Sequence, residues 1–60
     1  MTTEEKRLIR RIELAIEEHY GNKILRNYLE AMIRDIEIGV SDLSLQHFEF
    51  WLKAHLDENY

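Results

Sequence analysis

Three histidines are the side chains best suited to metal or acid–base chemistry in this 60-residue chain, which has no Cys. They are His19, His47 and His55. Two metal ligands on one helix need a spacing of three or four residues, whereas His47 and His55 are eight residues apart. Without Cys the commonest zinc ligand sets are also missing. The sequence therefore predicts no metal site and no other cofactor.

Groups for covalent or acid–base catalysis are equally sparse. The chain has no Gly-rich phosphate loop, and neither Ser41 nor Ser44 lies in a Gly-x-Ser-x-Gly motif. Glu17 and Glu18 are adjacent, so on a helix they point to different sides and do not form a catalytic pair. A chain this short also leaves little room for a ligand pocket of several hundred Å³. We expect a protein that is not an enzyme and has no small-molecule substrate.

The short length also raises a question of stability. A domain of about 60 residues buries only about 60% of its unfolded surface and usually needs disulfides, a metal or a partner chain. The chain is 45% hydrophobic, which is too apolar for disorder. No apolar run approaches the roughly 20 residues of a membrane span, and the first residues do not resemble a signal peptide. We expect a single helical domain over residues 1–60, in the cytoplasm.

Two glycines divide the chain into three helical segments. Gly21 and Gly39 each follow a helical pattern, and glycine is favoured in the left-handed conformation that closes a helix. Thr2 with Glu5 fits a capping box, and Asn22 can cap the second segment. The third segment can be capped by Ser41 or Ser44. Connections of about two to five residues predict antiparallel neighbours. The expected fold is an all-α compact three-helix bundle with helices at about 3–20, 23–38 and 42–57.

Helical wheels place more apolar side chains on these helices than a small bundle can bury. The expected core stripes are Leu8, Ile9, Ile12, Ala15, Ile16, His19 and Tyr20; Ile24, Leu25, Tyr28, Leu29, Met32, Ile33, Ile36 and Val40; and Leu45, Phe48, Leu52, His55 and Leu56. Leu14 and Phe50 point away from these stripes, and Trp51 lies on the edge of the third. Large exposed apolar patches usually mark interfaces, and each large side chain buried there contributes about 1.5–3 kcal/mol. We therefore expect dimerisation or partner binding through the second and third helices.

The expected contact surface combines aromatic anchors with a polar rim. Tyr28, Phe50 and Trp51 are the expected anchors, because aromatic side chains dominate binding hot spots. The expected interface residues are Leu14, Tyr28, Met32, Ile38, His47, Phe50, Trp51 and Ala54. The expected acidic rim consists of Asp35, Glu37, Asp42 and Glu49.

Charge is unevenly divided along the chain and leaves a second function open. Residues 1–34 carry seven cations and six anions, for +1, whereas residues 35–60 carry one cation and six anions, for −5. Carboxylates on a rigid helical protein can imitate a row of phosphates and occupy a basic groove of a partner. The acidic third helix does not suit an anionic membrane surface, which prefers Lys and Arg.

One segment resembles a DNA-binding motif. Residues 38–45, with Gly-Val-Ser before the third helix, resemble the turn of a helix-turn-helix. The segment departs from that motif at Asp35, where a small residue is usual. The would-be recognition helix also carries Glu49 and Asp57, with Lys53 as its one cation. Because DNA affinity depends on Lys and Arg contacts to phosphates, direct DNA binding is disfavoured.

The favoured hypothesis is a small non-enzymatic regulatory or inhibitory protein that acts by protein–protein contact, as a homodimer. Small helical phage and bacterial regulators are a loose analogy. The alternatives are a nucleic-acid-related role, as an acidic mimic or a degenerate helix-turn-helix, and a structural subunit of a larger assembly.

Overall fold

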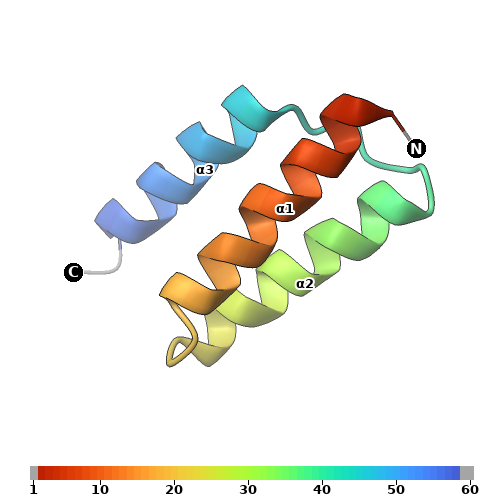
Figure 1. Ribbon diagram of the computed structural model, residues 1–60. Helices are drawn as coiled ribbons and strands as arrows, with labels where there is room; N and C mark the ends of the chain where they lie inside the picture. Colours follow the sequence, from red (N-terminus) through yellow and green to blue (C-terminus); the bar gives the residue numbers. More distant parts are fainter. Residues whose placement is uncertain (1, 59–60) are drawn as a thin grey trace.

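The computed structural model describes residues 2–58, and this range contains three α-helices (Figure 1). Helix α1 covers Thr3–Glu18, α2 covers Lys23–Glu37 and α3 covers Leu45–Glu58. The expected all-helical fold with three helices is confirmed. The bounds differ slightly, because α1 ends two residues earlier and α3 begins three residues later than the sequence predicted.

The start of α1 is stabilised by the predicted capping box. The backbone N–H of Glu5 donates to Thr2 Oγ1 at 3.1 Å, and the backbone N–H of Thr2 donates to Glu5 Oε1 at 2.9 Å. The hydrogen bond from the Thr2 backbone favours the ionised carboxylate and lowers the pKa of Glu5 below its ordinary value of 4.5. Two of the backbone donors that a helix start leaves open are thereby satisfied.

Polar side chains also cap the other two helices. Asn22 Oδ1 accepts from the backbone N–H of Leu25 at 3.1 Å, as predicted. Of the two serines proposed for α3, Ser44 is the cap, and its Oγ accepts from the backbone N–H of His47 at 3.1 Å. Ser41 Oγ instead accepts a backbone N–H within the connector between α2 and α3. The position of Ser44 explains why α3 begins later than predicted.

The two glycines have different backbone roles. Gly39 has a φ of +82°, its N–H donates to the Ile36 carbonyl at 3.1 Å, and the N–H of Val40 donates to the Asp35 carbonyl at 3.0 Å. This pair of bonds is a Schellman motif that closes α2, as predicted. Among the described glycines Gly39 alone has a positive φ, so the left-handed conformation expected at Gly21 was wrong. Helix α1 has already ended when the chain reaches Gly21.

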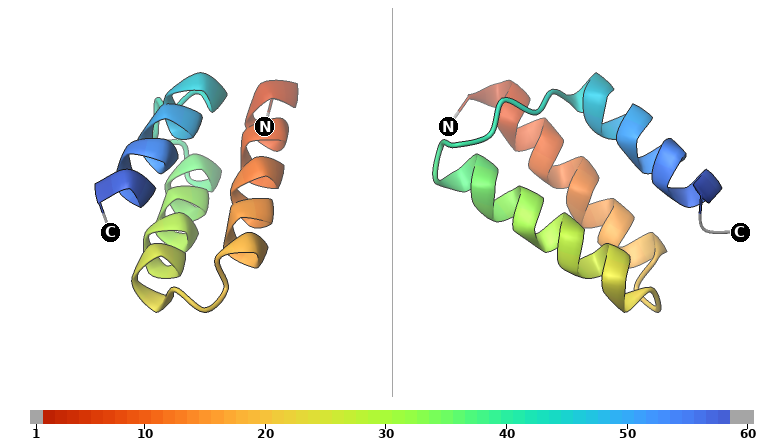
Figure 2. Two further views of the ribbon diagram at one scale, coloured as in Figure 1. Left: turned by 90° about the vertical axis from the view of Figure 1, so that its left-hand side faces the viewer. Right: turned by 180° about the vertical axis from the view of Figure 1, so that it is seen from behind.

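Helix α1 packs against both other helices. The four-residue connection 19–22 makes α1 and α2 antiparallel, as predicted (Figure 1). The connection 38–44 has seven residues, which is longer than the two to five expected. It carries the chain back to the start of α1, so that α3 runs in roughly the same direction as α1 (Figure 2). The helices α2 and α3 meet through long side chains, without close backbone approach.

The core of the described residues consists of eight buried apolar side chains, and all eight lie on the predicted stripes. They are Leu8, Ile12, Ala15, Leu25, Leu29, Ile36, Phe48 and Leu52. Five residues that were also expected in the core are instead exposed: Tyr20, Ile24, Tyr28, Val40 and Leu45. Tyr20, Ile24, Val40 and Leu45 lie at a helix end or just beyond one, where the neighbouring helix no longer covers them, whereas Tyr28 lies within α2.

Candidate protein-interaction surface

An aromatic cluster joins α2 to α3. The Tyr28 ring lies edge-on to Trp51, with 6.3 Å between ring centroids, and edge-on to His55 at 5.9 Å. Trp51 stacks on His55 at 5.1 Å, and on its other side lies near the buried Phe48 at 6.3 Å. Trp51 and His55 are one helical turn apart, which places both rings on the side of α3 that faces Tyr28. We call Tyr28, Trp51 and His55 the aromatic seam.

The aromatic seam is partly open to solvent. Tyr28 is 53% exposed, while Trp51 and His55 are half-buried. The structure therefore brings the predicted anchors Tyr28 and Trp51 together and holds them against the core through Phe48. His55 was expected on the core stripe, and nothing in its spacing singled it out as a neighbour of Tyr28. Tyr28 and His55 come into contact only because α3 packs alongside α2.

Phe50 lies on a different side of α3. It is 77% exposed, whereas Phe48, two residues earlier, is fully buried. Two residues correspond to a rotation of about 200° on a helix, so Phe50 points away from α1 when Phe48 faces it. His47 and Ala54 are one turn from Phe50 on the same outward side, and both are exposed. The interface residues predicted on α3 thus fall into two groups. Trp51 belongs to the aromatic seam, whereas His47, Phe50 and Ala54 lie outside it.

Two further predicted interface residues lie on α2 or at its end. Met32 is half-buried, one turn after Tyr28, and packs against the core. Ile38 is 64% exposed and is the last residue before the left-handed turn at Gly39. Met32 is therefore partly covered by the core, and Ile38 lies at the C-terminal end of α2.

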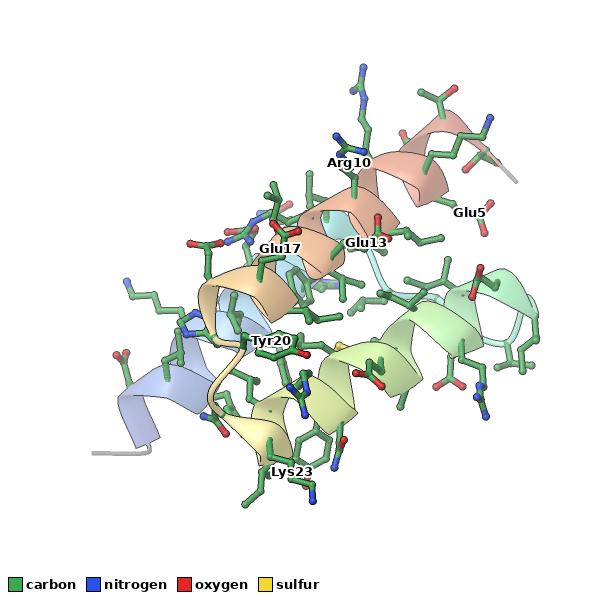
Figure 3. The ribbon with its side chains drawn as sticks, turned by 60° about the horizontal axis from the view of Figure 1, so that its bottom comes forward. Glu5, Arg10, Glu13, Glu17, Tyr20 and Lys23 are labelled. Carbon is green, nitrogen blue, oxygen red and sulfur yellow. The ribbon has the colours of Figure 1, made fainter. Side chains whose placement is uncertain are left out.

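Leu14 does not share a surface with the aromatic side chains of α2 and α3. It is 48% exposed on the outward side of α1. The side chains of Arg10, Glu13 and Glu17 line the shallow hollow around it, along one side of the helix (Figure 3). A single exposed leucine among charged side chains is common on protein surfaces. Leu14 thus lies among charged residues of its own helix, none of which was predicted for the interface.

The four carboxylates of the expected rim do not form one row. Asp35 lies on the same side of α2 as Tyr28, two turns later, whereas Glu37 lies on the opposite side. Asp42 lies in the connector, beside the first turns of α1. Glu49 faces α1 and pairs with an arginine of that helix. Of these four residues, Asp35 alone shares a helix face with the aromatic seam.

Arg11 links α1 to α3, a role that the sequence did not indicate. Its guanidinium pairs with Glu49 of α3, approaches Glu18 at 3.4 Å, and lies 5.9 Å from the ring centroid of Phe48. The pair with Glu49 joins two helices, so it cannot be predicted from an i,i+4 spacing within one helix. Because Glu49 is engaged within the fold, it is a poor candidate for a phosphate-like group offered to a partner.

The connector between α2 and α3 differs from the motif that it resembles. Seven residues separate these helices, whereas a helix-turn-helix uses a turn of three or four residues. An open groove of about 530 Å³ lies between the connector and the first turns of α1. Its lining includes Glu5, Arg7, Asp42 and Leu45. Gly39 here serves to close α2.

Neither a metal-binding cluster nor a helix suited to cross a bilayer occurs in residues 2–58. No three His, Asp or Glu side chains in this range lie close enough together to hold a metal ion. No helix there has the length and apolar character needed to cross a bilayer.

Comparisons of the chain with protein-family models, curated proteins and solved structures gave no match. The exposed aromatic side chains of α2 and α3 are the strongest indication of function on the described surface.

Proposed function

We propose that this chain is a small non-enzymatic regulatory or inhibitory protein that acts by protein–protein contact, as a homodimer, through α2 and α3. One observation carries the proposal: Tyr28 on α2 is 53% exposed and Phe50 on α3 is 77% exposed. Tyr, Trp and Phe are enriched in interface cores and binding hot spots, while scattered aliphatic exposure is ordinary. The exposed aromatics therefore favour a binding protein.

The surface area of the chain supports the proposal. The chain exposes 4811 Å², whereas a compact monomer of 7.3 kDa is expected to expose about 4,200 Å². The excess of roughly 600 Å² is close to the 800 Å² or so that each partner buries in a standard interface. Burial of this surface would supply stability that a chain of this length lacks.

The packing of the aromatic seam favours binding in a second way. Trp51 is held between His55 and Phe48, and Tyr28 lies edge-on to two of these rings. Rings that are already packed lose less conformational freedom when a partner docks, so less binding energy is spent on ordering them. This arrangement suits an anchor for a protein partner.

Affinity capture from a lysate of the native source tests the proposal. The immobilised wild-type chain should retain a specific protein, Tyr28→Ala should lose it, and Leu14→Ala should keep it. Leu14 is the matched control because it is 48% exposed, close to the 53% of Tyr28, and lies on α1 among charged side chains. Retention that is equal for all three chains would contradict the assignment of the surface. Absence of both partner and self-association would contradict the function.

A salt titration of the captured complex separates this proposal from nucleic-acid mimicry. An aromatic interface weakens only mildly with added salt, whereas a row of carboxylates in a basic groove weakens steeply. Mimicry has less support, because Glu49 is paired with Arg11, and because Asp35 and Glu37 lie on opposite sides of α2.

A further inference from the structure

Four side chains form a regular row along the outside of α3. His47, Phe50, Ala54 and Asp57 are separated by three, four and three residues, which is the spacing of a and d positions in a coiled coil. All four are exposed, and they lie opposite Phe48, which faces the core. We call these four residues the outer row of α3. A row at this spacing with an exposed Phe near its centre suits pairing with another helix.

We propose that the outer row of α3 pairs two copies of this chain, with the two α3 helices antiparallel about a two-fold axis. This inference rests on the proposed function, since it assigns the second copy to one of the exposed surfaces. In a two-fold contact, residue i meets residue j and residue j meets residue i. Phe50 of each copy then covers Ala54 of the other, and His47 of each copy faces Asp57 of the other.

The row is self-complementary in this orientation alone. Antiparallel pairing places a large ring over a small side chain twice, which lets the two helices approach closely. It also places an imidazole opposite a carboxylate twice. Parallel pairing would set Phe50 against Phe50 and Asp57 against Asp57, so that rings crowd and like charges meet. The order His, Phe, Ala, Asp along the row therefore selects the antiparallel arrangement.

The position of α3 in the fold leaves this surface accessible. Helix α3 lies at the edge of the bundle, and neither α1 nor α2 covers its outer side in any of the three ribbon views (Figure 1 and Figure 2). The 14 residues of α3 span about 21 Å, long enough for the whole row to engage one partner helix. The excess surface of roughly 600 Å² is of the order that a second copy would cover.

Cysteine cross-linking tests the orientation directly, because the chain has no Cys of its own. Under mild oxidation, a mixture of His47→Cys and Asp57→Cys chains should give a covalent heterodimer, and each chain alone should stay uncross-linked. In the proposed pair the two copies of residue 47 lie about 15 Å apart along the axis, too far for a disulfide. Self-cross-linking of His47→Cys, or an unreactive mixture, would overturn the antiparallel arrangement.

Sedimentation equilibrium tests the surface independently of any cross-link. Phe50→Ala should raise the dimer dissociation constant roughly a hundredfold or more, since each dimer loses two central aromatic contacts. Ala54→Glu should do the same by placing a charge under the ring, while Lys53→Ala, beside the row on the same helix, should change it less than about threefold. Far-UV circular dichroism confirms that each variant is folded.

The two proposals fail in different ways. A wild-type chain that stays monomeric up to millimolar concentration, or a dimer that Phe50→Ala leaves intact, overturns the assignment of the outer row. Tyr28→Ala lies outside the row and should leave the dimer dissociation constant unchanged. Loss of a captured partner in Tyr28→Ala therefore supports the aromatic seam, whatever the outcome at Phe50.

Discussion

Two phenylalanines of α3 provide the sharpest test of how this helix is oriented. Phe48 is fully buried against α1, and Phe50 is 77% exposed. The same substitution to Ala at these two positions should therefore affect different properties. Phe48→Ala should strongly destabilise the folded monomer, whereas Phe50→Ala should leave the monomer as stable as the wild type and remove self-association.

The expected sizes follow from burial. Truncation of a buried Phe to Ala costs about 3–5 kcal/mol. A chain of this length has an unfolding free energy of roughly 3–9 kcal/mol, from about 0.05–0.15 kcal/mol per residue. Phe48→Ala should therefore remove a large part of the free energy of unfolding of the monomer. Truncation of an exposed side chain usually changes stability by less than about 0.5 kcal/mol, so Phe50→Ala should match the wild type as a monomer.

Urea unfolding followed by circular dichroism, at several chain concentrations, measures both effects. The wild-type midpoint should rise with concentration, because association stabilises only the folded chain. The Phe50→Ala midpoint should stay constant and equal the wild-type value at the lowest concentration. Equal destabilisation by the two substitutions at that concentration would show that α3 does not present Phe48 inward and Phe50 outward.

Two further substitutions test local features of the fold. Gly39→Ala should lower the free energy of unfolding by about 1–2 kcal/mol, because φ at Gly39 is +82°. Gly21→Ala should leave the free energy of unfolding unchanged or raise it by up to about 1 kcal/mol, because a Cβ there meets nothing within 4 Å. Thermal melts in which both variants shift equally would refute this difference. The folded-state pKa of Glu5 is lowered, so its contribution to stability is complete above its unfolded-state pKa and is lost as the pH falls through the folded-state value. Glu5→Gln can keep the capping box without titrating, and should lose less stability than the wild type between about pH 6 and pH 3 in melts at each pH; identical pH profiles would contradict the role of the carboxylate.

Local signals in the sequence were sufficient to predict most of the fold. The caps at Thr2 and Asn22, and the helix end at Gly39, depend on residues within one turn of one another. The apolar stripes depend on a helical period that the chain itself carries, and they contain all eight core residues. Gly21 was misjudged because a glycine near a helix end is compatible with several turn conformations.

The candidate site was less predictable, because it depends on how helices approach one another. Helical wheels show that Leu14 and Phe50 point outward from their own helices, but not which residues of other helices lie beside them. Conversely, Tyr28 and Trp51 meet only because α3 lies alongside α2. The ion pair between Arg11 and Glu49 also depends on how the helices pack, since it joins residues far apart in the sequence.

Self-association and partner binding would be coupled through α3. This helix carries two rings of the aromatic seam, Trp51 and His55, on one side and Phe50 on the other. Pairing of two copies through the outer row would stabilise α3 as a helix and hold Trp51 in its place beside Tyr28. A partner that docks on the aromatic seam would then lose less conformational entropy in ordering the seam, so it would bind the dimer more tightly. Because coupling between two binding equilibria is reciprocal, the bound partner would also strengthen the dimer. Addition of the partner should therefore lower the dimer dissociation constant of the wild-type chain, and a constant unchanged by saturating partner would show that the two surfaces act independently.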